Sequence, residues 1–433
     1  MADSNKHTPS LRFPEFNSAP GWIILPIGEV ADTFSGGTPY VGNSDFYGGT
    51  IPFIRSGEIA CEKTAISLTE YGLSNSAAKM IKKGTLLYAL YGATSGNVAI
   101  SKIDGAINQA ILAIIPKDDK YNNYFVYYFL EYQKPSVLSK YLQGGQGNLS
   151  AAIINSIPIA IPCNCDGTIS CDEQAKVVDI LLSLDSLIAA TKSKLEQLKE
   201  HKRGLMQRLF PAKGRTVPTI RFPEFKNDGE WEEHAFSDIF TFIPNNTLSR
   251  ANLNNEIGSV QNIHYGDVLI RFRESLNVQK EQLPFISNVQ NIDIYSKAKL
   301  ANGDVIIADT AEDETVGKCT ELIGLAGEII VSGLHTIAIR PNIMFASGYL
   351  GFYMNSNSYR EQLTQIMQGI KVLSISKTAI GHTKIRFPSS INEQEKIACS
   401  LSSINDAIKT YEDKITALEL HKKGLMQQLF PKL

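Results

Sequence analysis

The sequence lacks any long apolar run, and its 433 residues contain only six cysteines and two tryptophans. Its longest apolar stretch, Ala151 to Pro162, is interrupted by Asn155, Ser156 and Pro158, so we expect no membrane-spanning helix. The polar start, MADSNKHTPS, has no apolar core of the kind found in secretory signals. We therefore expect a soluble, cytoplasmic chain.

The few cysteines are expected to be free thiols, because a large chain of this kind resides in a reducing compartment. Cys163, Cys165 and Cys171 lie close together, which leaves part of a metal site as the alternative. Their spacing is irregular and no histidine is near, so they fit zinc poorly. We expect a surface loop there and no bound metal.

Motifs for the common catalytic chemistries are also missing. The 18 prolines include no Pro-Pro pair, which an adenine methyltransferase motif would need, and no phosphate-binding GxxxxGK[ST] loop occurs. The Phe34-Ser35-Gly36-Gly37 segment is interpreted as a plain turn rather than a cofactor loop. The seven histidines form no arrangement with serine and aspartate that suggests a catalytic triad. We predict a chain without a catalytic site or a cofactor of its own.

Charge leaves the choice of partner open. The net charge is −2, with 42 basic against 44 acidic residues, so no overall basic character points to nucleic acid. A local basic stripe can still exist within a neutral total. Length predicts two or three domains, and 43% hydrophobic residues provide material for buried cores.

An internal repeat organises the chain. The segment LRFPEF at residues 11–16 returns as IRFPEF at 220–225, and the two tryptophans, Trp22 and Trp231, have the same offset of 209. Residues 173–211 align without a gap on 393–431, with 17 of 39 positions identical. A repeat over this length indicates a tandem duplication.

The two 39-residue blocks are predicted to be long helices, because apolar residues recur alternately four and three positions apart, as in a coiled coil. Asp172 and Asn392 are the expected N-caps, and Pro211 and Pro431 the expected ends. Two helices that pack on separate cores are the alternative. The residues predicted to form the helix interface are Leu181, Leu184, Ile188, Leu195, Leu198, Leu401, Ile404, Ile408, Ile415 and Leu418.

We therefore predict an α+β fold with two β-rich domains, separated by two long antiparallel coiled-coil helices in a pseudo-twofold tandem repeat. Gly-marked turns and short apolar strands occur in matching order in the two β-rich blocks, although their residues differ. The expected divisions are an N-terminal segment packing on helix ends at 1–20, a first β-rich domain at 21–172, a first helix at 173–211, a linker at 212–230, a second β-rich domain at 231–390 and a second helix at 391–433.

These residues resemble the specificity subunit of type I restriction–modification systems. The resemblance rests on the RFPEF segments, Gly36-Gly37-Thr38-Pro39, the segment 51–55 (IPFIR), the segment 90–94 (LYGAT), the segment 106–109 (AINQ) and the Glu-Gln pairs that open both helices. It covers essentially the whole chain. The second block departs from it, with Pro244-Asn245-Asn246-Thr247 in place of the GGTP segment and Gly333-Leu334-His335 in place of Asn108-Gln109.

The resemblance implies that each β-rich domain is a target-recognition domain for one half of a split, asymmetric DNA site. It implies that the helices form the spacer between them. It also implies docking of two methyltransferase subunits that bind S-adenosylmethionine, and it leaves open whether ATP-dependent restriction subunits join. A scaffold whose twin domains bind a protein or a carbohydrate is the competing hypothesis, and a stand-alone nuclease or methylase is disfavoured by the missing motifs.

Loops on a β scaffold would present donors and acceptors to base edges, although many such contacts go to the DNA backbone. Arg271 and Arg273 flank Phe272 at strand spacing, so both are expected on one face. The candidates for DNA contacts are Thr38, Tyr40, Arg55, Ser56, Thr94, Ser95, Asn97, Gln146 and Asn148 in the first domain, and Asn245, Asn246, Arg271, Arg273, Lys371 and Ser374 in the second.

Overall fold

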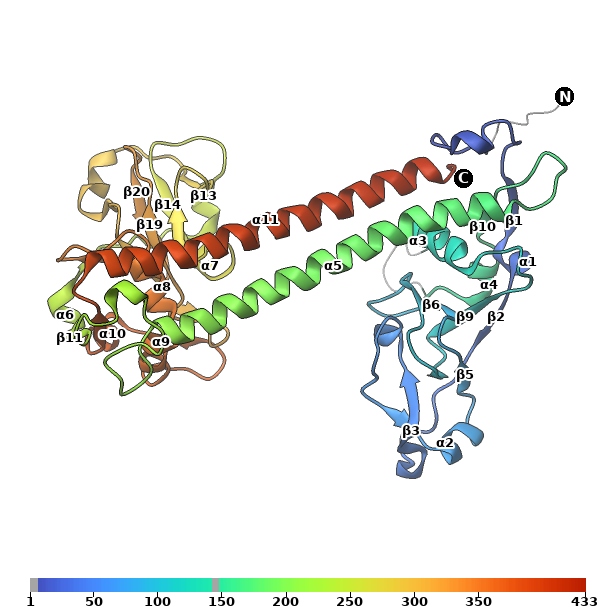
Figure 1. Ribbon diagram of the computed structural model, residues 1–433, viewed down its shortest axis with the longest axis horizontal. Coiled ribbons are helices and arrows are strands. Elements are labelled where there is room, and N and C mark those ends of the chain that lie inside the picture. Colours follow the sequence, from blue (N-terminus) through green and yellow to red (C-terminus); the bar gives the residue numbers. More distant parts are fainter. Residues whose placement is uncertain (1–6, 142–147) are drawn as a thin grey trace. The chain divides into compact units, whose positions relative to one another are not determined.

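The computed structural model describes residues 7–141 and 148–433. The chain divides into two compact units (Figure 1): unit 1 comprises Met1–Lys192 with Asp413–Leu433, and unit 2 comprises Ser193–Glu412. Each unit thus contains the first part of one long helix and the last part of the other. Within the described residues, no helix is both long and apolar enough to cross a membrane.

Unit 1 consists mainly of short strands with one longer helix, α3, that packs on them. In chain order its elements are η1 (Pro14–Phe16), β1 (Ile23–Pro26), α1 (Ile27–Val30), β2 (Ala31–Ser35), η2 (Ser44–Phe46), β3 (Tyr47–Ile54), η3 (Ser56–Glu58), β4 (Ser67–Leu68), α2 (Glu70–Ser74), β5 (Lys79–Ile81), β6 (Leu86–Ala89), β7 (Val98–Ile100), β8 (Gly105–Ile107), β9 (Ile111–Pro116), α3 (Asn123–Tyr141), α4 (Ala151–Asn155) and β10 (Pro158–Ile161), followed by the start of the long helix α5 (Cys171–Leu209).

The strands of unit 1 form three sheets. One four-stranded sheet has the order β2-β9-β6-β7, the other has the order β4-β3-β8-β5, and β1 pairs with β10. Strands β2 and β6 are both antiparallel to the central β9, whereas β3 and β8 are parallel. Strand β6 is buried along its whole length, as its continuous apolar sequence predicts.

Unit 2 repeats this order with additional short elements. They are η4 (Pro223–Phe225), β11 (Glu232–Ala235), α6 (Phe236–Ile239), β12 (Phe240–Ile243), η5 (Arg250–Asn252), β13 (Leu253–Asn254), β14 (Gln261–Ile263), α7 (Tyr265–Ile270), β15 (Ser275–Asn277), β16 (Phe285–Ile286), η6 (Ile292–Ala298), β17 (Val305–Ala308), β18 (Thr310–Ala311), β19 (Cys319–Ile323), β20 (Ile330–Ser332), β21 (Thr336–Pro341), α8 (Tyr349–Asn355), α9 (Asn357–Thr364), β22 (Leu373–Ser374), α10 (Lys377–Gly381), β23 (Lys384–Phe387) and the start of α11 (Ile391–Leu429).

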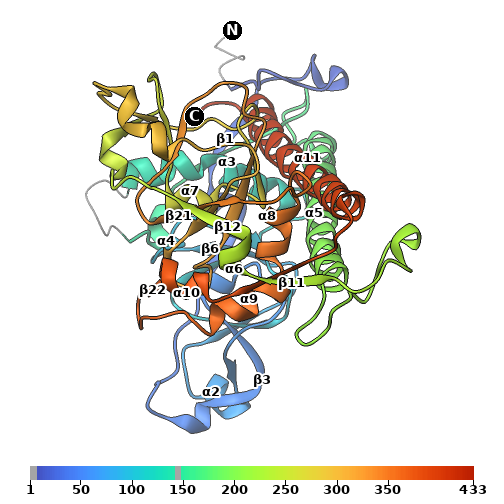
Figure 2. The ribbon, with the colours of Figure 1, turned by 90° about the vertical axis from the view of Figure 1, so that its left-hand side faces the viewer.

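The sheets of unit 2 correspond to those of unit 1. A five-stranded sheet, β12-β21-β17-β19-β15, takes the place of β2-β9-β6-β7, and β13-β16-β14-β20 contains a parallel pair, β14 and β20, as β3 and β8 do in unit 1. Strand β11 pairs with β23, and the short strands β18 and β22 form a separate pair. Figure 2 faces this unit, with β12 and β21 adjacent.

The long helices begin at equivalent serines, which corrects the predicted caps. The hydroxyl of Ser170 accepts a hydrogen bond from the backbone N–H of Glu173, and that of Ser390 accepts one from Glu393. Asp172 and Asn392 are one position inside the first turn, because α5 begins at Cys171 and α11 at Ile391. The Asp172 carboxylate still stabilises α5, because a negative charge in the first turn interacts favourably with the helix dipole.

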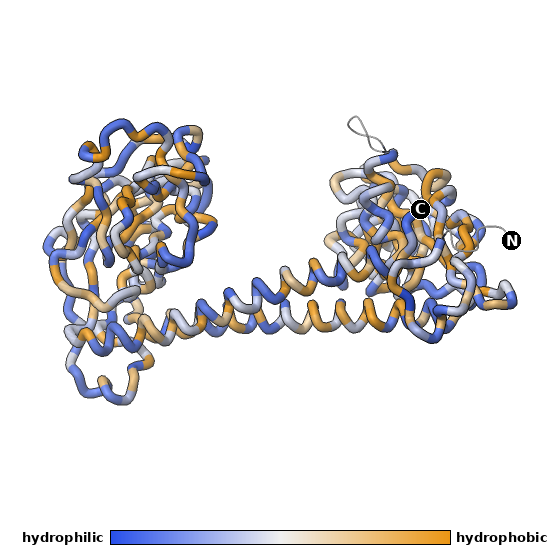
Figure 3. Tube along the Cα trace, turned by 90° about the horizontal axis from the view of Figure 1, so that it is seen from above, coloured by the Kyte–Doolittle hydropathy of each residue, from blue (hydrophilic) through white to orange (hydrophobic). Residues whose placement is uncertain are grey.

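The two helices run antiparallel within each unit. In unit 1, Lys192 pairs with Glu419 and Asp185 pairs with Lys422, so residue numbers rise along one helix while they fall along the other. Hydrophobic and hydrophilic residues alternate along both helices (Figure 3). Of the predicted interface residues, Leu181, Ile188, Leu195, Leu401, Ile408 and Ile415 are buried, and Leu184, Leu198, Ile404 and Leu418 are partly buried.

The far end of each helix completes the core of the other repeat's β-rich domain. Met426 and Leu429 of α11 and Phe430, which directly follows this helix, lie in the core of unit 1, where the Phe430 ring meets Trp22 at 6.3 Å. Phe210, which directly follows α5, meets Trp231 at the same centroid distance in unit 2. The repeated helix ends are therefore core elements of the two units.

Candidate nucleic-acid interface

The strand ends of unit 1 gather several loops at one edge, which we call the first loop edge. Strands β2 and β6 both end beside the start of β9, with Ser35 opposite Leu112 and Ala89 opposite Ile111. Strand β8 ends three residues before β9, and the parallel strand β3 ends beside it. The loops 36–46, 55–58, 90–97 and 108–110 therefore share this edge.

The glycines of the first loop are required by a close approach. A Cβ atom on Gly36 would lie 1.8 Å from the carbonyl oxygen of Ile107, and one on Gly37 would lie 2.5 Å from the Ala77 side chain. Only glycine fits such contacts. The loop continues to Thr38, whose hydroxyl donates to the side chain of Gln109 at 2.6 Å, and to Tyr40, which is 76% exposed.

The structure brings most of the predicted residues of the first domain to this edge. Thr38, Tyr40 and Arg55 are exposed there, and Asn148, which immediately precedes buried Leu149, is exposed as well. Leu149 donates a backbone hydrogen bond to Leu90, so Asn148 stands next to the loop 90–97. The predicted residue Gln146 lies outside the described residues.

Several of these side chains already have partners. The Arg55 guanidinium binds Glu58 at 3.0 Å and lowers the pKa of that carboxyl group. The Ser95 hydroxyl donates to the Leu90 carbonyl at 2.9 Å, and the ammonium group of Lys134 donates to Asn97 at 2.5 Å. Ser56 and Thr94 are partly buried. Tyr40 and Asn148 are exposed, whereas the exposed Thr38 already donates its hydroxyl to Gln109.

Unit 2 has a corresponding second loop edge. Strands β12 and β17 end beside the start of β21, with Ile243 opposite Ala338 and Ala308 opposite Thr336. The parallel pair β14 and β20 ends there too. The second loop edge comprises the loops 244–249, 264–265, 309–316 and 333–335 and the hairpin 368–374.

Two predicted asparagines of the second edge differ in role. The Asn246 side chain donates to Asn262 at 2.7 Å and to the Ser332 carbonyl at 3.0 Å, which makes it part of the scaffold. Asn245 is less constrained, since it donates to the Gly333 carbonyl at 3.3 Å and accepts from Lys377 at 3.3 Å. Lys371 and Ser374 are exposed on the hairpin.

Sequence reasoning missed His335 as a member of this edge. Its backbone is left-handed, with a φ of 55°, which is uncommon for a residue other than glycine. The imidazole lies 3.4 Å from both the Asp309 carboxylate and the Thr310 hydroxyl, and its ring meets Tyr265 edge-on. The available signal was that Gly333-Leu334-His335 replaces the Asn108-Gln109 segment of the first block.

The strand spacing expected for Arg271 and Arg273 is not found, because no strand runs through them. Helix α7 ends at Ile270, and the two arginines bind different partners. Arg271 donates to the Gln282 carbonyl and lies 3.6 Å from Asp267. Arg273 binds Glu412 of α11 at 2.7 Å, so it anchors the β-rich domain to the long helix and does not face the second loop edge.

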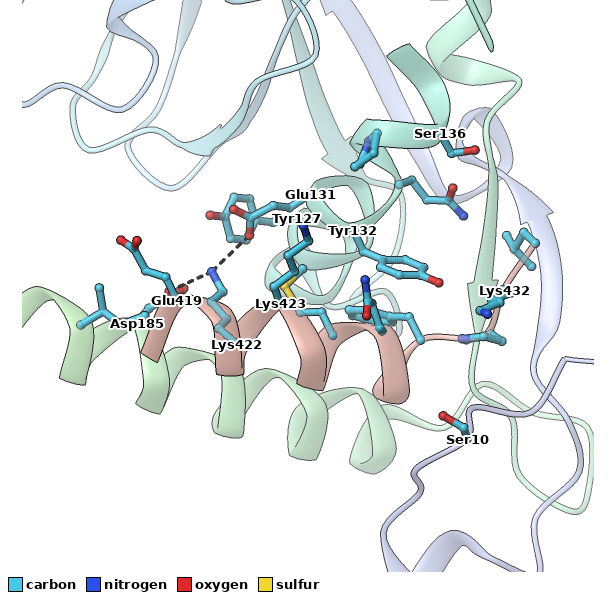
Figure 4. A pocket seen from close by; sticks show the side chains of 18 of the residues that line it. Ser10, Tyr127, Glu131, Tyr132, Ser136, Asp185, Glu419, Lys422, Lys423 and Lys432 are labelled. Atoms are coloured by element: carbon cyan, nitrogen blue, oxygen red, sulfur yellow. Dashed lines mark hydrogen bonds and ion pairs between the residues drawn. The ribbon is translucent and has the colours of Figure 1, made fainter. Parts of the chain in front are cut away.

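A cavity of about 1400 Å³ lies in unit 1 between α3 and the end of α11 (Figure 4). Lys422 extends into it and binds Asp185 at 2.8 Å and Glu131 at 3.3 Å. The Lys422 ammonium group also lies 5.1 Å from the ring centre of Tyr128, whose pKa is raised by burial and by its hydrogen bond to Asp185. This explains why a lysine interrupts the apolar helix seam.

The equivalent lysine of unit 2 binds a different acid. Lys202 contacts Glu274 at 2.5 Å, and Asn405, at the position equivalent to Asp185, donates to the same carboxylate. The lysine is the same in both repeats, whereas its acidic partner comes from α5 and α3 in unit 1 and from the segment before β15 in unit 2.

The three cysteines considered as part of a metal site, Cys163, Cys165 and Cys171, differ in their exposure to solvent. Cys163 is buried with its thiol against the Gly21 carbonyl, and burial raises the pKa of that thiol. Cys165 and Cys171 are exposed. Within the part of the chain that the structure describes, no three histidine, cysteine or acidic side chains gather as metal ligands would.

Comparison with known proteins identifies relatives. Residues 20–200 match the family model described as the type I restriction modification DNA specificity domain. The MjaIX specificity subunit of Methanocaldococcus jannaschii is 27% identical over 228 residues, covering 50% of this chain and 47% of the relative. The MjaVIII specificity subunit of the same organism is 20% identical over 455 residues, covering 98% of this chain and 94% of the relative.

A solved structure shares the fold. The S subunit of a type I restriction–modification system from M. genitalium has a TM-score of 0.57 at 14% identity, covering 98% of this chain and 100% of that one. The sequence similarity to the MjaX and MjaIX specificity subunits of M. jannaschii spans less than half of those proteins, 46% and 47% of their lengths. Residues 20–200 are thus similar to the type I restriction modification DNA specificity domain, and the chain shares the fold of a type I S subunit over nearly its whole length.

Proposed function

We propose that this chain reads DNA sequence for a type I restriction–modification complex, with each loop edge binding one half of a split, asymmetric site. The observation that carries the proposal is the pair of loop edges, built on corresponding strands but bearing different side chains. Exposed Thr38, Tyr40 and Asn148 stand on the first, and Asn245, His335 and Lys371 on the second. Different donors and acceptors on one scaffold suit two different half-sites.

The helices would set the distance between the half-sites. A helix of 39 residues is about 58 Å long at 1.5 Å per residue, and one DNA turn is about 34 Å. A pair of such helices can therefore span neighbouring major-groove faces of a duplex. The exposed faces of α5 and α11 would dock two methyltransferase subunits.

The partner subunits would carry out the catalytic reactions. S-adenosylmethionine would bind the methyltransferase subunits, and ATP would bind restriction subunits if the complex includes them. The chain itself would act without a catalytic site, in the cytoplasm where host DNA is methylated. Its contribution to the reaction would be the choice of the DNA site and its position relative to the methyltransferase.

The test is a selection from random duplexes with the chain in complex with a type I methyltransferase subunit that binds it. We expect a split consensus of two unlike half-sites with a fixed spacer. Tyr40→Ala should alter only one half-site, and Lys371→Ala should alter only the other. Ile115→Ala and Met344→Ala are matched controls, because both side chains are exposed but stand away from the loop edges. Absence of any consensus would reject the proposal and favour a protein- or carbohydrate-binding scaffold.

A further inference from the structure

The hairpin 368–374 of unit 2 is an ordered projection of the second loop edge. Gln368 and Ser374 exchange two backbone hydrogen bonds of 3.0 and 2.8 Å. Strand β22 at its root pairs with β18, where Thr310 lies opposite Ser374. The next residue, Ile375, is 3% exposed and donates a backbone hydrogen bond to Asp309. The hairpin is thus fixed to the core at its base.

The tip of the hairpin has a defined shape. Gly369 has a φ of 119°, and a Cβ atom there would lie 1.9 Å from the Val372 carbonyl oxygen. Only glycine permits this turn. The turn presents Ile370 with its whole side chain exposed, 101%, and Val372 with 51% exposed. Two aliphatic side chains exposed to water on a hairpin that is fixed at its base offer an apolar contact surface to a partner.

The charges around the hairpin indicate which part of a duplex it meets. Lys371 is exposed between the two aliphatic residues, but Glu312, Asp313 and Glu314 are exposed on the loop after β18. Three carboxylates disfavour close approach to phosphates. Base edges in the major groove suit this surface better, because cytosine and adenine offer amino donors to carboxylates and thymine offers a methyl group to aliphatic side chains. The groove is also wide enough for a two-stranded β-ribbon.

We infer that the hairpin 368–374 enters the major groove at the second half-site and that Ile370 packs against a thymine methyl group. This inference rests on the proposed function and adds to it a reading element and a base. Ile370 is then a specificity residue that acts by apolar contact, while the neighbouring polar side chains of the second loop edge supply hydrogen bonds.

The test combines a protein change with a change in the DNA. The selected duplex is prepared with each thymine of the second half-site replaced in turn by uracil, which removes only the methyl group. Wild-type complex should lose about fourfold in affinity at one position, the expected effect of one buried methyl group. Ile370→Ala complex should bind the thymine and uracil duplexes equally. Met344→Ala, which removes another exposed side chain, should behave like the wild type.

The outcomes separate this inference from the proposed function. If no split consensus is selected at all, the proposed function fails. If a consensus is selected but contains no thymine in the second half-site, or if uracil weakens wild-type and Ile370→Ala complexes equally, only the hairpin inference is overturned. Loss of methyltransferase binding by Ile370→Ala, with DNA specificity unchanged, would also overturn it, because the tip would then contact protein.

Discussion

Arg12 and Glu173 are joined by two hydrogen bonds of 2.7 Å, although 161 residues separate them in the sequence. Arg221 and Glu393 form the same pair in unit 2. Both carboxylates are 1% exposed and lie in the first turn of a long helix. The arginine of each RFPEF segment therefore holds that segment on the start of the helix of its own repeat.

Removing one partner of this buried pair should destabilise unit 1 strongly. Glu173→Gln leaves the Arg12 guanidinium buried without a counter-charge, and such a loss costs about 3 kcal/mol of unfolding free energy. Urea unfolding can be followed by Trp22 fluorescence in a Trp231→Phe background, since the chain has one tryptophan in each unit. Glu15→Gln, in the exposed Glu15–Lys176 pair, is the control and should leave the midpoint unchanged. Equal midpoints for the two variants would contradict the argument.

The stability of unit 2 should fall as the pH rises towards 7. Burial raises the pKa of Glu321 from 4.5 to about 7, although its carboxylate accepts hydrogen bonds from Gly348 and Gly351. The folded chain then holds a proton that the unfolded chain releases, so stability is lost between about pH 4.5 and pH 7 and is level above that window. Unfolding monitored by Trp231 in a Trp22→Phe background should show this fall. Glu321→Gln should flatten it, and an unchanged slope in that variant would contradict the assignment.

The long helices could be predicted because their signal is local and repeated. A seam of apolar residues over 39 positions appears twice, and the same seam residues are buried or partly buried in the structure. The matching order of strands was also visible in the sequence. The caps were misplaced by two residues, because Asp172 and Ser170 are both good capping residues and only backbone geometry distinguishes them.

Which helix end completes which core could not be predicted. Leu205, Met206, Leu209 and Phe210 are repeated identically at 425, 426, 429 and 430, so the sequence does not tell the two ends apart. The directions of the loop side chains could not be predicted from the sequence either. Arg273 binds Glu412, which is 139 residues away, and no spacing rule anticipates such a pair. Candidate site residues were therefore placed by loop position rather than by contact.

A chain cut near Val217 should yield two fragments that assemble with each other. Each unit contains residues from both sides of this cut, and Met426 of α11 and the following Phe430 belong to the core of unit 1. A separate first fragment would expose the rings that meet Phe430, among them Trp22 and Phe129. Co-expressed fragments should elute as one complex in size-exclusion chromatography, and Phe430→Ala should weaken it. Fragments that remain monomeric when mixed would contradict this division.

Lengthening the helices should lengthen the DNA spacer and change nothing else. Four residues inserted after both Thr191 and Tyr411 add about 6 Å to each helix, close to the rise of two base pairs. These positions are equivalent in the repeat and lie at or within two residues of the boundaries between the units, so neither loop edge is altered. Selection from random duplexes should return both original half-sites separated by about two more base pairs. The control is the same insertion after Lys213, in the linker between α5 and unit 2's η4, which should leave the spacer unchanged. If the helix insertions also leave the spacer unchanged, the distance between half-sites is set by another part of the complex, and the helices serve only to join the two domains.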